Sequence, residues 1–315
     1  MAATTAAAGE KKGVSRTEIL VLAALSLGYL VLSYFLLGFK TDQLVLVGLV
    51  NLLYYLSAVT RKFITGFSVF VVFWVLYDYM KAFPNYWFNP VHIQALYHAE
   101  KTLFGISSGQ VILTPNEFWQ LHYNVFLDVI CGAFYLTWIP VPLAFAGFLF
   151  FRNRRQFVYF SLTFLLVNLL GFVVYYLYPA APPWYVQQHG FEFIANTPGS
   201  TAGLARFDAF FGTSVFKSLY AKGSNVFAAM PSLHSAYPLL VFYYALRTRL
   251  GLVNILFGII TVGIWFAAVY TSHHYVLDVL AGILCAVCGI LLFNWFVATN
   301  NLARKGVEKL VAAVS

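Results

Sequence analysis

Most of this chain consists of long hydrophobic runs separated by short polar segments. The runs fall at about 18–38, 43–60, 63–80, 124–151, 156–178, 230–247, 252–271 and 275–298. A helix needs about 20 apolar residues to cross the roughly 30 Å hydrocarbon core of a bilayer. The pattern therefore predicts eight transmembrane helices, with the second and third among the shortest. The first run is too long for a signal peptide, and the second follows it almost at once.

The composition agrees with this pattern. Of 315 residues, 61% are hydrophobic and only 10% are charged, so the chain cannot present a water-facing surface on all sides. We predict an all-α fold, a polytopic membrane helical bundle. Residues 1–17 are rich in Ala and Thr and are expected to form a disordered cytoplasmic tail, and residues 300–315 a second cytoplasmic tail.

The distribution of basic residues indicates the topology, because cytoplasmic loops are enriched in Lys and Arg. With the N-terminus inside, thirteen of the 19 basic residues lie on the inner side: Lys11, Lys12, Arg16, Arg61, Lys62, Arg152, Arg154, Arg155, Arg247, Arg249, Arg304, Lys305 and Lys309. Both termini are then cytoplasmic. The net charge of +8 follows from this topology, and no basic stripe indicates nucleic-acid binding.

Two long segments, 81–123 and 179–229, fall on the outer face in this topology. The first contains an amphipathic stretch from Val91 to Phe104, which indicates a short helix lying along the membrane surface. The second is a loop of a length that is uncommon unless it covers a site. Cys131, Cys285 and Cys288 lie inside predicted spans and indicate no disulfide framework.

Two motifs place ionisable side chains at the edges of apolar runs, where such groups mark functional sites. Met-Pro-Ser-Leu-His occupies 230–234, and the second motif holds His274 and Asp278. The proline and serine of the first motif suit the start of a helix, whose N-terminus binds anions. His274 and Asp278 are four residues apart on one helical face, so the carboxylate can orient the imidazole as a nucleophile. His234 is then free to act as acid or base.

Other residues near these motifs are candidates for substrate binding. Three cations of the outer loop could stabilise charge in a reaction, and Lys222 ranks first because it lies 12 residues before His234. The candidates are the cations Lys222, Arg206 and Lys217, the hydrogen-bond donors Ser232 and Asn225, and the aromatic residues Tyr185 and His273. The alternatives are surface cations facing lipid headgroups, an interfacial aromatic belt, and a polar network that pins helices together.

The two motifs resemble the second and third signature motifs of the type 2 phosphatidic acid phosphatase superfamily. In that family a Pro-Ser-Gly-His motif supplies a general acid, and a later His-x-x-x-Asp supplies a nucleophile and its orienting carboxylate. His234, His274 and Asp278 occupy those places. The resemblance implies a six-helix core over 61–299, preceded by two additional helices over 18–60.

Two cationic features of the phosphatases are missing. Ala268 stands where they carry an Arg six residues before the nucleophilic His, and Ala-Ala-Pro-Pro-Trp-Tyr at 180–185 replaces their Lys-containing first motif. A phosphate monoester is close to a dianion and calls for several cations, whereas a diester carries one charge. The losses therefore favour a phosphodiester substrate.

The residues of the motifs resemble those of the inositol phosphorylceramide synthase branch, the aureobasidin-resistance type. In that branch a Leu also replaces the Gly of the phosphatase motif. Three stretches carry this resemblance: Tyr178–Tyr185, Ala229–Ser235 and His273–Asp278. Members move phosphoinositol from phosphatidylinositol to the hydroxyl of ceramide. The resemblance implies those lipids as partners and a phosphohistidine intermediate on His274. No metal or other cofactor is required, because fixed dipoles and cations can stabilise the developing charge.

Two other functions remain open from the sequence. A lipid phosphatase of the same superfamily would share the first half-reaction and use water in place of the acceptor alcohol. A transporter, or a membrane enzyme that binds a metal through His234, His274 and Asp278, would use different chemistry. The headgroup, the acceptor lipid and any protein partner are not determined by the spacing.

Overall fold

A computed structural model describes residues 14–221, 223 and 225–315, and these residues are mostly helical. The predicted all-α fold is confirmed, with one small β-hairpin added to it. Residues 1–13 of the predicted disordered tail lie outside the described residues, and the first helix begins at Arg16. Residues 301–314, which we predicted as a tail, form a helix.

The chain forms two compact units. The first comprises the described residues up to Ser68 together with Ala312–Ser315, and the second comprises Val69–Val311. The first unit holds α1 (Arg16–Leu37), α2 (Thr41–Leu56) and the beginning of α3 (Ala58–Tyr79). All candidate site residues that the structure describes belong to the second unit.

The second unit continues from α3 through short 3-10 segments, a hairpin and further helices. They are η1 (Met80–Ala82), η2 (Asn85–Trp87), α4 (Gln94–Phe104), β1 (Ile106–Ser108), β2 (Val111–Leu113), α5 (Pro115–Leu121), α6 (Val125–Leu136), α7 (Pro140–Arg152), α8 (Arg154–Leu177), α9 (Pro183–His189), η3 (Ala202–Leu204), α10 (Ala205–Phe211), α11 (Val215–Ala221), α12 (Leu233–Thr248), α13 (Val253–Tyr270), α14 (Val276–Thr299) and α15 (Asn301–Val314). The two strands pair antiparallel, with Ile106 opposite Leu113.

Each of the eight predicted runs contains a helix, and the chain is a multi-pass membrane protein. Among the described residues, five helices are long and apolar enough to cross a bilayer: α1, α3 with η1, α8, α13 and α14. The predicted 124–151 span is instead two helices, α6 and α7, bent by 42°. Pro140 explains the break, since it has no main-chain N–H to continue the ladder. α2 and α12 have 16 residues each, about 24 Å at 1.5 Å per residue.

The helices that carry the two motifs pack directly together. α12 lies against α13 and α14, and α14 also lies against α8. Gly282 of α14 faces the start of α12, where a Cβ atom at 282 would collide with the main-chain oxygen of Ser232. Small residues allow helix backbones to approach closely inside a membrane protein, so this glycine sets the distance between the two motifs.

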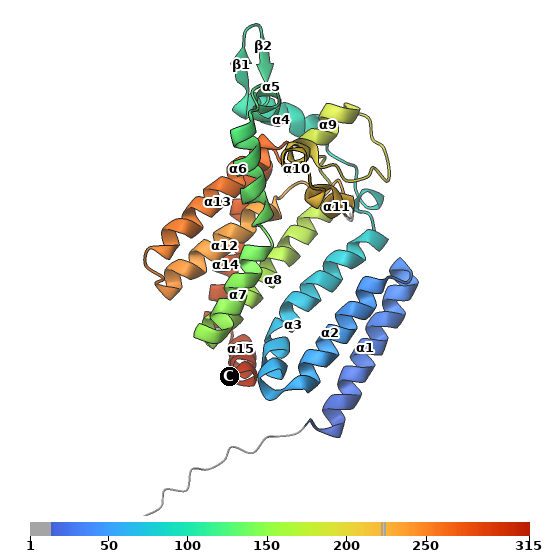
Figure 1. The fold of residues 1–315 in the computed structure, drawn as a ribbon, viewed down its shortest axis with the longest axis vertical. Helices are drawn as coiled ribbons and strands as arrows, with labels where there is room; N and C mark the ends of the chain where they lie inside the picture. The colour runs from blue at the N-terminus through green and yellow to red at the C-terminus, as the bar shows by residue number, and fades with distance from the viewer. Residues whose placement is uncertain (1–13, 222, 224) are drawn as a thin grey trace, which may run out of the picture. The chain divides into compact units, whose positions relative to one another are not determined.

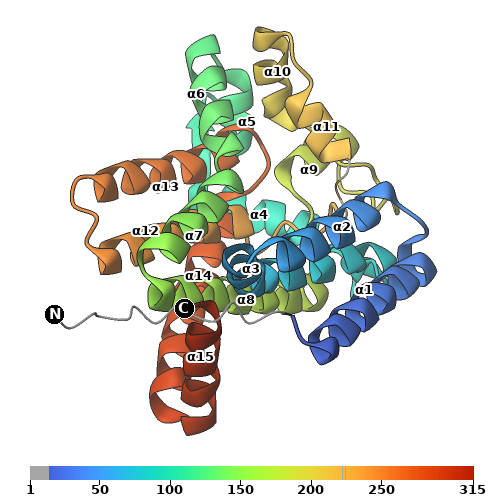
Figure 2. The ribbon, with the colours of Figure 1, turned by 60° about the horizontal axis from the view of Figure 1, so that its bottom comes forward.

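The short elements gather at one end of the second unit. Figure 1 shows α4, α5, α9, α10 and α11 there, with the β-hairpin beyond them, and Figure 2 shows the same grouping from another side. α4 contacts α14, and α5 contacts α13. The predicted helix within Val91–Phe104 is therefore confirmed as α4. Segments 81–123 and 179–229 thus cover the helix ends that carry the histidine motifs.

Candidate active site

The two motifs meet at the first turns of α12 and α14. Ser232 is the N-cap of α12, and its Oγ accepts hydrogen bonds from Ser235 N at 3.3 Å and Ser235 Oγ at 3.1 Å. The predicted capping role of Ser232 is therefore confirmed. Its main-chain N–H donates to the main-chain oxygen of Asp278 at 2.9 Å, which joins one motif to the other.

His234, His274 and Asp278 lie in a row. His234 Nδ1 is 2.9 Å from His274 Nε2, a hydrogen-bond distance. On the other side of the same ring, His274 Nδ1 is 3.6 Å from Asp278 Oδ2. That oxygen also accepts the N–H of Tyr275 at 2.8 Å. Catalytic hydrogen bonds are often long before substrate binds, so the row can act as a proton path with a carboxylate at its end.

This row is enclosed. His274 is 5% exposed and Asp278 is fully buried, whereas His234 is only partly buried. His274 Nδ1 and Asp278 Oδ1 have no hydrogen-bond partner among the described residues. Buried polar atoms are nearly always paired in folded proteins, and unpaired ones gather where chemistry occurs. His234 is therefore the most exposed member of the row.

His273 lies beside the row. Its Nδ1 is 3.1 Å from Thr271 Oγ1, and the rings of Tyr135 and Tyr220 lie at 5.2 and 4.7 Å from it, centroid to centroid. Burial, together with the nearby His274, lowers the pKa of His273 to about 3. His273 is therefore neutral at physiological pH and contributes a dipole to the site, not a positive charge.

Two aromatic residues of the bent helix pair contact the His234 ring, and the sequence did not indicate either contact. Trp138 lies edge-on to His234 with a centroid distance of 4.2 Å, and Tyr135 contacts the rings of both His234 and His273. Nothing in the sequence distinguishes these two among 21 tyrosines and 7 tryptophans. They fix the orientation of the His234 ring.

The predicted cations differ in their surroundings. Arg206 forms an ion pair with Asp128, with 2.6 Å from Nε to Oδ1, and Tyr270 donates to the same carboxylate oxygen at 2.7 Å. Asp128 is therefore a hydrogen-bonded carboxylate. Lys217 is exposed on α11, and Lys222 lies outside the described residues. Arg206 is thus partly neutralised by its carboxylate partner.

Tyr185 and Asn225 shape the outer loop 179–229. The buried Tyr185 hydroxyl donates to Glu192 O at 2.6 Å and accepts from Ile194 N at 2.8 Å. Asn225 Oδ1 accepts from Phe227 N at 3.1 Å. Asn225 also lines a cavity of about 280 Å³. No hydrogen bond within the described ranges joins Tyr185 or Asn225 to the histidine row, so their binding of substrate stays a prediction.

Side chains of segment 81–123 form hydrogen bonds with the turn that carries His274. The sequence did not indicate these contacts. Asn116 Nδ2 donates to the main-chain oxygens of Val269 at 2.8 Å and His274 at 2.9 Å. The Glu100 carboxylate accepts the N–H groups of Val276 at 2.9 Å and Leu277 at 3.1 Å. Both side chains are fully buried. Segment 81–123 therefore binds both a main-chain carbonyl and main-chain N–H groups of the second motif.

The same segment also supports the first motif. Asn85 donates to the main-chain oxygens of Tyr175 and Phe227, at 2.8 and 2.9 Å. His92, Ala180 and Ala228 form two parallel bridges, so three distant segments pair as in a small sheet. Ala228 stands just before the first motif, and its position is thereby fixed from segment 81–123.

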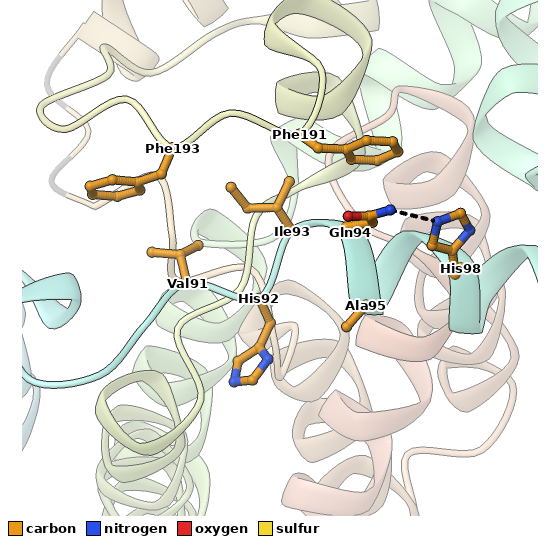
Figure 3. A pocket seen from close by; sticks show the side chains of 8 residues that line it. All are labelled: Val91, His92, Ile93, Gln94, Ala95, His98, Phe191 and Phe193. Atoms are coloured by element: carbon orange, nitrogen blue, oxygen red, sulfur yellow. Dashed lines mark hydrogen bonds between the residues drawn. The ribbon is translucent and has the colours of Figure 1, made fainter.

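A shallow groove lies over this support. Val91, Ile93, Phe191 and Phe193 contribute apolar side chains to a space of about 530 Å³. Figure 3 shows these side chains along the groove, with Gln94 and His98 joined at one end and the His92 ring turned away. The His92 ring instead stacks on Tyr178, with a centroid distance of 3.8 Å.

The Glu100 carboxylate gives the protein a pH-dependent stability. Burial, with the nearby Asp278 charge, raises the pKa of Glu100 to about 7, against two N–H groups that lower it. The folded protein therefore holds a proton that the unfolded chain has lost between the ordinary pKa of 4.5 and about 7. This contribution to stability is complete below pH 4.5 and is lost as the pH rises through 7.

We expect Glu100→Gln to remove this dependence, because glutamine does not titrate. The free energy of unfolding of the variant, minus that of the unmodified protein, should rise by up to roughly 3 kcal/mol as the pH goes from acidic to alkaline. Thermal unfolding midpoints of both proteins in detergent, at about pH 5 and about pH 8, test this. A difference in midpoint that stays the same at both pH values would contradict it.

Fold and site together define an integral membrane protein with a His-His-Asp row at the ends of two packed helices. A family model described as the PAP2 superfamily matches residues 108–292, and the chain belongs to this superfamily.

Three relatives narrow the comparison. A phosphoinositol dihydroceramide synthase of Bacteroides thetaiotaomicron is 42% identical over 283 residues, which cover 89% of this chain and 93% of that protein. The inositol phosphorylceramide synthase catalytic subunit AUR1 of Saccharomyces cerevisiae is 28% identical over 264 residues, 77% of this chain and 58% of that protein. Its counterpart aur1 of Schizosaccharomyces pombe is 26% identical over 230 residues, 70% of this chain and 51% of that protein.

The chain thus covers nearly all of the bacterial relative and somewhat more than half of the two yeast relatives. No solved structure matches. The resemblance to the inositol phosphorylceramide synthase branch, predicted from the motifs, is confirmed by these relatives.

Proposed function

We propose that this protein is a membrane lipid phosphotransferase that moves phosphoinositol, or a similar headgroup phosphodiester, from a glycerophospholipid to the hydroxyl of a ceramide-type acceptor. The observation that carries the proposal is the row of His234, His274 and Asp278 in a chain that is 42% identical to a phosphoinositol dihydroceramide synthase. A lipid phosphatase is less favoured, because all three relatives are named as synthases.

The resting proton order follows from the distances. Asp278 Oδ2 lies 3.6 Å from His274 Nδ1 and favours the tautomer with the proton on that nitrogen, which leaves a lone pair on His274 Nε2. His234 Nδ1 donates to that lone pair across 2.9 Å. His274 is thus the nucleophile. When the anionic phosphodiester binds, His234 carries a proton on both ring nitrogens, and this imidazolium holds the proton that a leaving group needs.

In the first half-reaction, the donor phosphate enters between the two rings. His274 Nε2 forms a bond to phosphorus while the bond from phosphorus to the glycerol oxygen breaks. His234 gives its proton to that oxygen, and diacylglycerol leaves. The headgroup remains on His274 as a phosphohistidine diester, and Asp278 stabilises the positive charge on the ring.

In the second half-reaction, the acceptor hydroxyl replaces diacylglycerol. His234 is now neutral and takes the proton of that hydroxyl while its oxygen bonds to phosphorus. The bond from phosphorus to Nε2 breaks, and His274 returns to its starting form. The candidate cations Lys222, Arg206 and Lys217 would offset the single charge of the diester, with Ser232, Asn225, Tyr185 and His273 as further candidate contacts.

The proposal includes the orientation of the chain. Both termini face the cytoplasm and the histidine row faces the outer side, as the basic residues of the loops favour. Residues 61–299 form the catalytic core, and 18–60 add two helices to it. The lipid donor therefore reaches the row from the outer leaflet.

Purified protein in detergent, supplied with labelled phosphatidylinositol and ceramide, tests the proposal. We expect a sphingolipid that carries the labelled headgroup, together with an equal amount of diacylglycerol. Mass spectrometry measures both products. Release of free inositol phosphate or inorganic phosphate without a labelled sphingolipid would contradict transfer and favour the phosphatase.

A further inference from the structure

The first turn of α14 is capped by a side chain from a different helix. The first N–H groups of a helix have no partner within the helix and are usually satisfied by the N-cap side chain. The N-cap residue here is Tyr275, whose side chain makes no capping hydrogen bond, and Asp278 accepts only the N–H of Tyr275 itself. Glu100, in α4, takes the next two N–H groups, those of Val276 and Leu277.

A buried carboxylate is a costly way to cap a helix. Burial disfavours its charge, and the nearby Asp278 carries charge of the same sign. Elsewhere the same chain uses an uncharged local cap, for instance Ser232 for α12 and Asn124 for α6. Unlike these caps, the carboxylate at 100 is charged, comes from a distant helix and engages both of its oxygens, so it fixes two consecutive peptide groups at once.

Those two peptide groups lie between the two reacting side chains of the second motif. His274 precedes Val276, and Asp278 follows Leu277. Asn116 holds the main-chain oxygen of His274 from the other side. A shift of the first turn of α14 would therefore change the distance of 3.6 Å between His274 Nδ1 and Asp278 Oδ2.

We propose that Glu100 is a positioning residue for transfer at His274: by fixing the first turn of α14, its carboxylate sets the alignment of the His274 ring with Asp278. The proposal rests on the proposed function of His274 as the nucleophile. Glu100 does not touch the substrate and acts only through α14. Misplacement of a catalytic group by about 1 Å can lower a rate about 100-fold.

Glu100→Gln tests this, because glutamine keeps the shape but offers one acceptor where two N–H groups need one each. We expect kcat to fall about 10- to 100-fold with KM for both lipids changed less than about threefold. Glu192→Gln is the control, since it makes the same change of charge at an exposed glutamate. We expect its activity to stay within about twofold of that of the unmodified protein.

A second measurement does not depend on turnover. Nitrogen NMR of histidine-labelled protein, without lipid, reports the tautomer of His274 and its interaction with Asp278. We expect the His274 signals to shift in Glu100→Gln and to stay unchanged in Glu192→Gln. Unchanged signals and an unchanged kcat in a folded Glu100→Gln protein would overturn the positioning role. If the unmodified protein shows no transfer at all, the proposed function fails, and the NMR comparison alone still decides the role of Glu100.

Discussion

Replacing His274 with alanine is expected to abolish transfer, with a loss of about 10⁴-fold or more, because removal of a nucleophile leaves only binding and electrostatic contributions. Both nitrogens of His274 have a place in the row, since Nε2 faces His234 and Nδ1 faces Asp278. A neighbouring side chain cannot substitute, since His273 points its Nδ1 to Thr271. Transfer of labelled headgroup to ceramide measures the loss.

The intermediate gives a stricter measurement than the loss of rate. A two-step mechanism predicts that the unmodified protein exchanges labelled diacylglycerol with phosphatidylinositol in the absence of ceramide, because the first half-reaction is reversible. It also predicts acid-labile label on the protein. His274→Ala should show neither, and His122→Ala, at an exposed histidine of the outer segment, should show both. Absence of exchange and of bound label in the unmodified protein would contradict the phosphohistidine mechanism.

The sequence predicted those parts of the site that depend on local pattern. The cap at Ser232 and the i, i+4 spacing of His274 and Asp278 are properties of single helices. The meeting of His234 with His274 followed from topology, because both motifs begin helices on the same side. The bend at Pro140 was missed, because the apolar run continues through it without a polar break.

The supporting residues could not be predicted, because their partners are distant in sequence. Glu100 bonds to a residue 176 positions away, and Asn116 to one 158 positions away. A glutamate in an amphipathic helix is typical of a solvated face, so Glu100 carried no signal of burial. Arg206 was predicted as a candidate substrate-binding cation, and its ion pair was missed because the partner Asp128 lies 78 positions earlier.

Replacing His234 with alanine is expected to slow transfer from phosphatidylinositol by about 10²- to 10⁴-fold, the range for loss of a general acid or base. The reason is specific to the leaving group, since a glycerol alkoxide must be protonated as it departs. A donor with a nitrophenolate leaving group needs no proton. His234→Ala should therefore release one equivalent of nitrophenolate per protein at a rate close to that of the unmodified protein.

After this burst the variant should stall, because no base remains to deprotonate the acceptor hydroxyl in the second half-reaction. Rapid-mixing absorbance at pH 7 to 8 measures both phases, and His274→Ala, which lacks the nucleophile, should give no burst. Trp138 and Tyr135 contact the His234 ring, so the variant also removes packing. Equal losses with both donors would therefore show that His234 acts by holding His274 in place across their 2.9 Å contact, and would remove it from proton transfer.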